Sequence, residues 1–150
     1  MPVSDRLRTV ALDVTDPGSI AAALDTAGPV DAPVNNAGVP SISVFEGTPM
    51  APVREVFETN IFGMMATTRA VLPGFGERGS GVIVDVTSSV VLVHMLLSAV
   101  YKASKMAVEG FTASLALELA PFDVRARTVG PGACLTTNFR LPGNERRPAR

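Results

Sequence analysis

The chain is poor in the residues that bind metals and form covalent cross-links. It has one cysteine, Cys134, and one histidine, His94, in 150 residues. A single cysteine excludes an internal disulfide, so we expect a reducing compartment. One histidine and one cysteine do not supply the ligands of a conventional zinc site, and His94 lies in an apolar run without a catalytic motif. We therefore expect neither a metal centre nor a thiol nucleophile.

Charge and long apolar runs are also scarce. Charged residues make up 18% of the chain and the formal net charge is −1, so neither nucleic acid nor a membrane is an expected partner. Residues 140–150 are rich in proline and arginine, which is typical of a loose, solvated tail. The N-terminus has no apolar signal region, and no apolar run reaches the ~18 residues of a membrane span. The expected location is the cytoplasm.

Apolar residues are abundant. They make up 47% of the sequence, enough for the core of one domain, which we place over residues 1–139. The predicted strands are 7–12, 33–34, 82–86 and 124–129, and the predicted helices are 20–27, 49–72 and 99–119. Strands that alternate with helices are typical of an α/β fold with a parallel sheet.

The second predicted helix is followed by proline and glycine. Pro73 and the stretch after it are expected to end that helix and to form a loop. Gly74, Gly76 and Gly79 match the G-x-G-x-x-G spacing of a dinucleotide-binding turn. Such a turn follows a strand and opens a helix, whereas this stretch follows a helix and precedes a strand. We therefore interpret it as a loop without a binding role.

One pair of side chains is suited to proton transfer. Tyr101 and Lys105 are four residues apart on the predicted helix 99–119, so they share one face. A phenol with a pKa near ~10 is a poor acid or base at neutral pH, and a nearby ammonium favours its ionised form. The pair therefore suits proton exchange with a carbonyl or alcohol oxygen. A tyrosine on a helix also occurs in cores and interfaces, so the pair alone does not distinguish a catalytic role from a structural one.

The order of several motifs is more specific than any one of them. The pair resembles the Y-x-x-x-K motif of the classical short-chain dehydrogenase/reductases. Five further segments resemble motifs of that family, namely Asp13-Val14, the turn Asn35-Asn36-Ala37-Gly38, Asn60 with Gly63, the strand from Gly81 to Ser88, and Pro131-Gly132 with Thr136. The resemblance implies a partial Rossmann-like, doubly wound parallel sheet.

The resemblance also implies an activity and a set of site residues. The reaction would be hydride transfer between NAD or NADP and a small-molecule carbonyl or secondary alcohol. The implied catalytic residues are Asn60, Ser88, Tyr101 and Lys105. The implied cofactor-binding residues are Asp13, Val14, Asn35, Ala37, Gly38, Tyr101, Lys105, Pro131, Gly132 and Thr136. Tyr101 would exchange the proton, Lys105 would lower its pKa and bind the nicotinamide ribose, and Asn60 would hold a relay water.

The serine position has two candidates. Alignment of the strand from Gly81 places the catalytic hydroxyl at Ser88, thirteen residues before Tyr101. Ser89 is the fallback, because choosing it breaks the strand register. The hydroxyl of the catalytic serine would orient the same substrate oxygen as Tyr101 does.

Compared with the family pattern, the chain starts at the third strand. It lacks the first two strands and the glycine-rich turn on which the pyrophosphate lies. We therefore expect segment 7–12 to pair beside 33–34, with all helices on one face and the other face bare. The resemblance implies a homo-oligomer through helices 49–72 and 99–120. The alternatives are a catalytically silent remnant acting only through that helix surface, or a fragment with a misplaced start.

Overall fold

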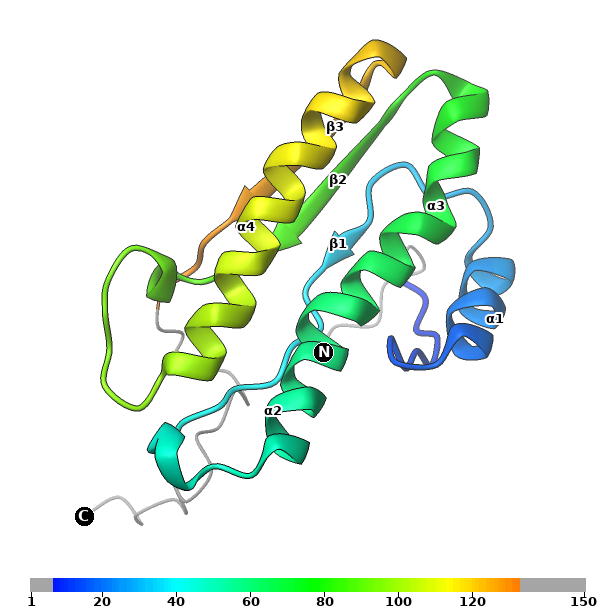
Figure 1. The fold of residues 1–150 in the computed structure, drawn as a ribbon. Coiled ribbons are helices and arrows are strands. Elements are labelled where there is room, and N and C mark those ends of the chain that lie inside the picture. Colours follow the sequence, from blue (N-terminus) through cyan, green and yellow to red (C-terminus); the bar gives the residue numbers. More distant parts are fainter. Residues whose placement is uncertain (1–6, 133–150) are drawn as a thin grey trace, which may run out of the picture.

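The computed structural model describes residues 7–132, which form a small sheet with helices packed on it (Figure 1). The strands are β1 (Val34–Asn35), β2 (Gly81–Val86) and β3 (Val124–Val129). The α-helices are α1 (Pro17–Ala27), α2 (Met50–Phe57), α3 (Met64–Arg78) and α4 (Ala99–Leu119). A π-helix, η2 (Glu58–Gly63), joins α2 to α3, and the 3₁₀ turns are η1 (Phe45–Gly47), η3 (Ser89–Val91) and η4 (Ala120–Phe122). None of the helices described over 7–132 has the length and apolarity to cross a bilayer.

The three strands are parallel and adjacent in the order β1-β2-β3, as the alternation of strands and helices predicts. Val34 pairs with Val84, and β2 runs beside β3 along its whole length. Parallel strands bring their carboxyl ends to one edge of the sheet, and in such folds ligands bind at that edge. The turn after Asn35 and the serine pair after β2 therefore lie at the same edge.

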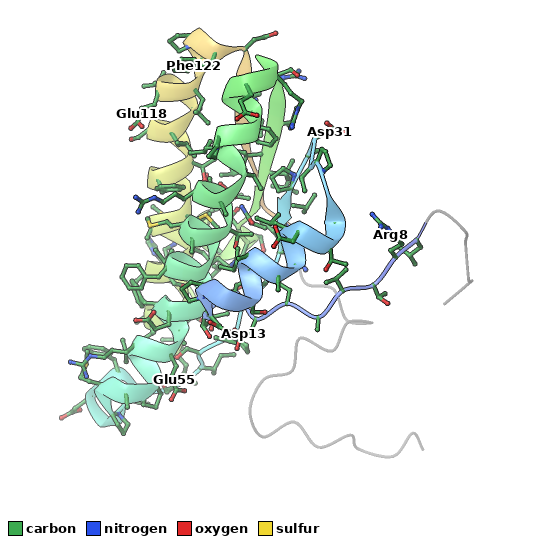
Figure 2. All side chains as sticks on the ribbon, turned by 90° about the vertical axis from the view of Figure 1, so that its right-hand side faces the viewer. Arg8, Asp13, Asp31, Glu55, Glu118 and Phe122 are labelled. Atoms are coloured by element: carbon green, nitrogen blue, oxygen red, sulfur yellow. The ribbon has the colours of Figure 1, made fainter. Side chains whose placement is uncertain are left out.

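Over residues 7–132, the helices α3 and α4 cover one face of the sheet. Alternate residues of β2 face the helices, so Ile83 and Asp85 are fully buried beneath α3 and α4. Val34 and Val129 point the other way and are 59% and 49% exposed. Figure 2 shows α3 and α4 on the same side of the strands, and no described helix covers the opposite side. The expected arrangement, in which segment 7–12 pairs beside 33–34 and all helices cover one face, is contradicted in its first part, because the described sheet holds only β1, β2 and β3, while α1 packs against α3.

The predicted strand 7–12 is wrong. These residues are exposed and unpaired, and Figure 2 shows the segment between Arg8 and Asp13 running past α1 instead of along a strand. The guanidinium of Arg8 donates to the carbonyl of Ala27, and the N–H of Asp13 donates to the hydroxyl of Ser19. The neighbouring strand β1 is only two residues long, so it offers too few ladder hydrogen bonds to hold a longer strand. The sheet therefore begins at β1.

The second predicted helix does not end at Pro73. Helix α3 continues to Arg78, so Gly74 and Gly76 are helical and not part of a loop. The missing N–H of proline costs one helical hydrogen bond, but Phe75, two residues later, is fully buried and anchors the helix in the core. Gly79, with φ of 60°, provides the left-handed residue that ends the helix. The glycine motif thus lies at a helix end, and a strand follows it.

The main core lies between the sheet and the ends of α3 and α4. Its buried members are Val71, Phe75, Ile83, Leu115, Val124 and Ala126. Helix α1 packs against α3 and adds Leu24 to the edge of this cluster. Asp16 caps α1 by accepting hydrogen bonds from two backbone N–H groups, which fixes the start of that helix. This core sets the spacing between β2 and α4, the two elements that carry the candidate site.

Candidate active site

The serine, tyrosine and lysine predicted from the sequence come together where β2 meets α4. Tyr101 is half-buried in the first turn of α4, and Lys105 is 4% exposed one turn later. The Nζ atom of Lys105 lies 6.0 Å from the centroid of the Tyr101 ring. The same Nζ donates a 2.8 Å hydrogen bond to the carbonyl of Val86, the last residue of β2. The lysine therefore ties the helix to the strand end.

Ser88, rather than Ser89, is placed beside the tyrosine. The side chain of Ser88 hydrogen-bonds the Tyr101 hydroxyl, and its Oγ also accepts from the N–H of Val90 at 3.3 Å. Ser89 begins the turn η3, and its N–H donates to the carbonyl of Pro131. The geometry thus favours the serine that the alignment of the strand selects.

Burial controls the ionisation of the pair. Burial raises the pKa of Tyr101 above its ordinary value, and the hydrogen bond from Ser88 opposes this increase only in part. Burial also lowers the pKa of Lys105, and the nearby carboxylate of Asp85 opposes that decrease. The resemblance implies that the lysine lowers the pKa of the tyrosine. In this structure the lysine proton is directed at Val86, and the net shift of the Tyr101 pKa is upward.

Asn60 lies in the π-helix η2 and is 1% exposed. Its Oδ1 accepts from the N–H of Val39 at 2.8 Å, and its Nδ2 donates to the carbonyl of Val39 and to the Ser104 hydroxyl, both at 3.0 Å. The carboxamide therefore joins the turn after β1 to α4. π-Helical turns are rare and occur frequently at functional sites. Here the π-turn places a buried carboxamide next to the tyrosine-bearing helix.

Gly38 leaves an open position between Asn60 and Lys105. A Cβ atom on Gly38 would lie 3.3 Å from Oδ1 of Asn60 and 3.5 Å from Nζ of Lys105. Any larger side chain would fill the space beside the lysine. Ala37 precedes Gly38 in the same turn, so this part of the predicted cofactor set borders the tyrosine and lysine.

Asn35 does not face this space. Its Nδ2 donates to Oδ1 of Asp85 at 2.8 Å and to the hydroxyl of Thr68 at 2.9 Å, inside the helix-covered face of the sheet. Thr112 on α4 donates to the other carboxylate oxygen of Asp85 at 2.7 Å. The sequence reasoning did not single out Asp85. A fully buried acid in an otherwise apolar strand was the available signal.

Asp13 and Val14 lie at the other end of the candidate site. The Oδ1 atom of Asp13 accepts from the N–H and the hydroxyl of Thr15, which lowers the pKa of this exposed carboxyl. Val14 packs so closely on Gly63 that a Cβ atom there would lie 2.7 Å from the Val14 Cγ2 atom. A cavity of about 1060 Å³ adjoins both cofactor segments, since Thr15 and Val39 line it.

Four further residues lie at or beyond the end of the described chain. Pro131 and Gly132 follow β3, and the carbonyl of Pro131 lies beside the serine pair. Thr136 and Cys134 lie outside the described residues. Over residues 7–132, no cluster of three or more His, Cys, Asp or Glu side chains is placed to hold a metal ion.

Lys102 has a structural role that its position in the sequence did not indicate. Its Nζ donates to the carbonyls of Val90, Val91 and Val93 at 2.9, 3.2 and 2.8 Å. One ammonium thus holds the loop that follows Ser88 against the start of α4. The next stretch of this loop is apolar and exposed, with Leu96 at 92%.

A parallel sheet with a serine at the carboxyl end of one strand, next to a Tyr–Lys pair on the following helix, defines an α/β protein of the Rossmann-like class. The model of the family described as short chain dehydrogenase matches residues 2–146, and the chain belongs to that family. The resemblance found in the motifs is thereby confirmed.

Similar proteins include curated relatives and solved structures. The chain is 39% identical to the uncharacterized oxidoreductase YusZ of Bacillus subtilis, over 90% of this chain and 49% of that protein. It is 40% identical to human retinol dehydrogenase 8, over 87% of this chain and 42% of that protein. A short-chain dehydrogenase from Streptomyces avermitilis superposes with a TM-score of 0.82 at 40% identity, over 90% of this chain and 52% of that one.

A second solved structure carries a cofactor. The 3-ketoacyl-(acyl-carrier-protein) reductase from Brucella melitensis, complexed with NADH, superposes with a TM-score of 0.79 at 32% identity. The match covers 83% of this chain and 55% of that one. The chain therefore spans about half the length of the proteins that it matches.

Proposed function

We propose that the protein is an oxidoreductase that transfers a hydride between NAD or NADP and a carbonyl or secondary-alcohol substrate. The observation that supports this most strongly is the contact of Ser88 with Tyr101, next to the buried amine of Lys105. Membership of the short chain dehydrogenase family supports the same reaction class. The cytoplasm remains the proposed location.

The three side chains divide the proton chemistry. Tyr101 donates a proton to the substrate oxygen, or accepts one from it, at its phenol oxygen. Ser88 already hydrogen-bonds that phenol, so its hydroxyl is placed to hold the same substrate oxygen. The ammonium of Lys105 stabilises the phenolate when the proton has left. Burial raises the pKa of Tyr101, so the phenol keeps its proton until a substrate oxygen accepts it.

The residues around Lys105 fit the nicotinamide end of the cofactor. The missing Cβ of Gly38 keeps space open beside the buried amine, which is a suitable donor to ribose hydroxyls. When bound, the cofactor supplies or accepts the hydride. Pro131 and Gly132, beside the serine loop, and Thr136 are proposed to bind the same end. Asn60 supports the turn that carries Gly38, since its carboxamide is bonded to Val39 and Ser104.

The adenosine end has fewer contacts. Asp13, Val14 and Ala37 are proposed to bind it, and Thr15 and Val39, which follow these segments in the chain, line the adjoining cavity. Asn35 contributes indirectly, because its amide holds the interior of the sheet. None of the described residues forms a glycine-rich turn between a strand and a helix, and Asp16 already occupies the N-terminus of α1.

The substrate class is proposed to be apolar. The loop between Ser88 and α4 exposes Leu92, Val93 and Met95 near the candidate site. Retinol, named in the description of one relative, is an apolar alcohol. A homo-oligomer through residues 49–72 and 99–120 is proposed as well, since Phe62 on η2 and Met106 on α4 are 54% and 48% exposed.

A titration of the purified chain with NADH and NADPH, followed by nicotinamide fluorescence, tests the proposal. We expect saturable binding that is lost in Lys105→Met. The exposed cation Arg54 on α2 gives a matched control, and Arg54→Met is expected to bind as the wild-type chain does. If a folded chain does not bind either cofactor at millimolar concentration, the catalytically silent alternative replaces the enzyme proposal.

A further inference from the structure

The strand β2 carries a carboxylate in the interior of the protein. Asp85 is 0% exposed and lies on the helix-covered face, directly before the strand residue whose carbonyl binds Lys105. A buried carboxylate is costly unless hydrogen bonds and an opposite charge compensate for its lost hydration. The neighbours of Asp85 therefore need to be accounted for.

Both oxygens of Asp85 are held by donors from different elements. Oδ1 accepts from the amide of Asn35 on β1, the residue paired with Asp85 across the sheet. Oδ2 accepts from the hydroxyl of Thr112 on α4. An ionised carboxylate only accepts hydrogen bonds, and both partners are able to donate. This set of partners matches the charged form of the acid.

The nearby positive charge is the amine of Lys105. Lys105 and Thr112 are seven residues apart on α4, which places them on one face, and both reach the end of β2. Tyr101 is the other titratable group beside the amine, and its ring centroid lies 6.0 Å from Nζ of Lys105. The neighbouring acid on α4, Glu109, is bonded to the hydroxyl of Thr128 on β3. From η2, the side chain in this region is the neutral Asn60.

We propose that Asp85 is a positioning residue, whose carboxylate, held by Asn35 and Thr112 next to the strand residue that binds Lys105, is the buried negative charge that favours the protonated form of Lys105 beside Tyr101. Burial of Lys105 lowers the pKa of its amine, and the negative charge of Asp85 opposes this decrease in pKa. The catalytic meaning of this inference rests on the proposed function, since a neutral lysine does not stabilise a phenolate. The electrostatic link itself exists whether or not the chain turns over substrate.

The substitution Asp85→Asn removes the charge and preserves the hydrogen bonds. The new amide oxygen still accepts from Asn35. The new amide nitrogen donates to Thr112, whose own proton then goes to the carbonyl of Val108, already 2.8 Å away. Every polar partner remains satisfied, so the variant is expected to fold. Asp25→Asn, on the exposed side of α1, makes the same charge change far from the site and is the control.

The ionisation of Lys105 is measurable without activity. The chain has only two lysines, Lys102 and Lys105, so labelling lysine Cε with ¹³C gives two signals, which Lys102→Arg assigns. We expect Asp85→Asn to move the Lys105 titration to lower pH, and by more than Asp25→Asn moves it. Equal shifts from the two substitutions, or no shift, would overturn the proposal.

A second variant covers the case in which Asp85→Asn fails to fold. Asp85→Val also removes the charge, and it leaves Asn35 bonded to Thr68 and Thr112 bonded to the carbonyl of Val108. A β-branched side chain suits a buried strand. This variant is expected to move the Lys105 titration to lower pH as Asp85→Asn does, and an unchanged titration would contradict the proposal. The two failures are distinguishable. If the chain binds no cofactor but its Lys105 titration shifts on substitution of Asp85, only the proposed function is refuted. If the chain binds cofactor and the Lys105 titration does not shift, only this inference is refuted.

Discussion

Gly63→Ala tests how the predicted adenosine-binding segment is held. Gly63 ends η2 where it approaches the segment before α1. A Cβ atom there would lie 2.7 Å from Cγ2 and 2.9 Å from the backbone oxygen of Val14. A backbone atom does not rotate away, so the segment must move from the helix. Overpacking of this kind costs about 1–3 kcal/mol, offset by up to ~1 kcal/mol from replacing a helical glycine.

The expected net loss is about 1–2 kcal/mol in the free energy of unfolding. Gly76→Ala is the matched control, because Gly76 lies within α3 and a Cβ there meets nothing within 4 Å. That variant is expected to gain about 0.5–1 kcal/mol. Urea unfolding followed by circular dichroism measures both. If Gly63→Ala is as stable as Gly76→Ala, Val14 does not pack against the start of α3.

Three further predictions follow from single side chains. Ser88→Ala is expected to raise the pKa of Tyr101 further, and Ser89→Ala is not; the chain has one tyrosine and no tryptophan, so absorbance near ~295 nm reads this group alone. Lys102→Met is expected to speed backbone hydrogen exchange in the loop after Ser88, because three hydrogen bonds to loop carbonyls are lost. An unchanged exchange rate would contradict the role of Lys102 in holding this loop. Burial lowers the pKa of Lys105 below 10.5, so the unfolded chain binds more protons between the folded pKa and 10.5. The free energy of unfolding of the wild-type chain should therefore rise with pH through that window. This rise should be absent in Lys105→Met, and urea unfolding at several pH values measures it.

The sequence predicts the strands and helices that carry the chemistry. The β-branched run 82–86 lies in the strand β2, residues 124–129 form the strand β3, and the apolar period of 99–119 is the helix α4, as the pattern indicates. Tyr101 and Lys105 share a face because a helix brings residues four apart together. These are local rules, and local sequence is sufficient to apply them.

The errors arose where tertiary contacts outweigh local preference. Pro73 does not end α3, because the burial of Phe75 two residues later holds the helix together. Segment 7–12 has the composition of a strand but no neighbour of sufficient length. The π-turn at Asn60 is also invisible in the apolar period, since it depends on bonds to Val39 and Ser104.

The site contains two residues that no motif indicated. Asp85 stands in a strand where an apolar side chain would be expected, and only the structure shows Asn35 and Thr112 converging on it. Lys102 lies between the motif positions of Tyr101 and Lys105, and its bonds to loop carbonyls depend on how that loop folds back. Both are long-range contacts that sequence spacing does not encode.

Oxidation of NADH or NADPH with an apolar ketone or aldehyde, followed at ~340 nm, is the most direct test of the Ser88–Tyr101–Lys105 site. The proposal predicts turnover by the wild-type chain and its loss in Tyr101→Phe, which keeps the ring and removes the proton. Circular dichroism would verify that both chains are folded. A Tyr101→Phe variant that turns over as fast as the wild-type chain, or a folded wild-type chain that binds cofactor without turnover, would contradict it.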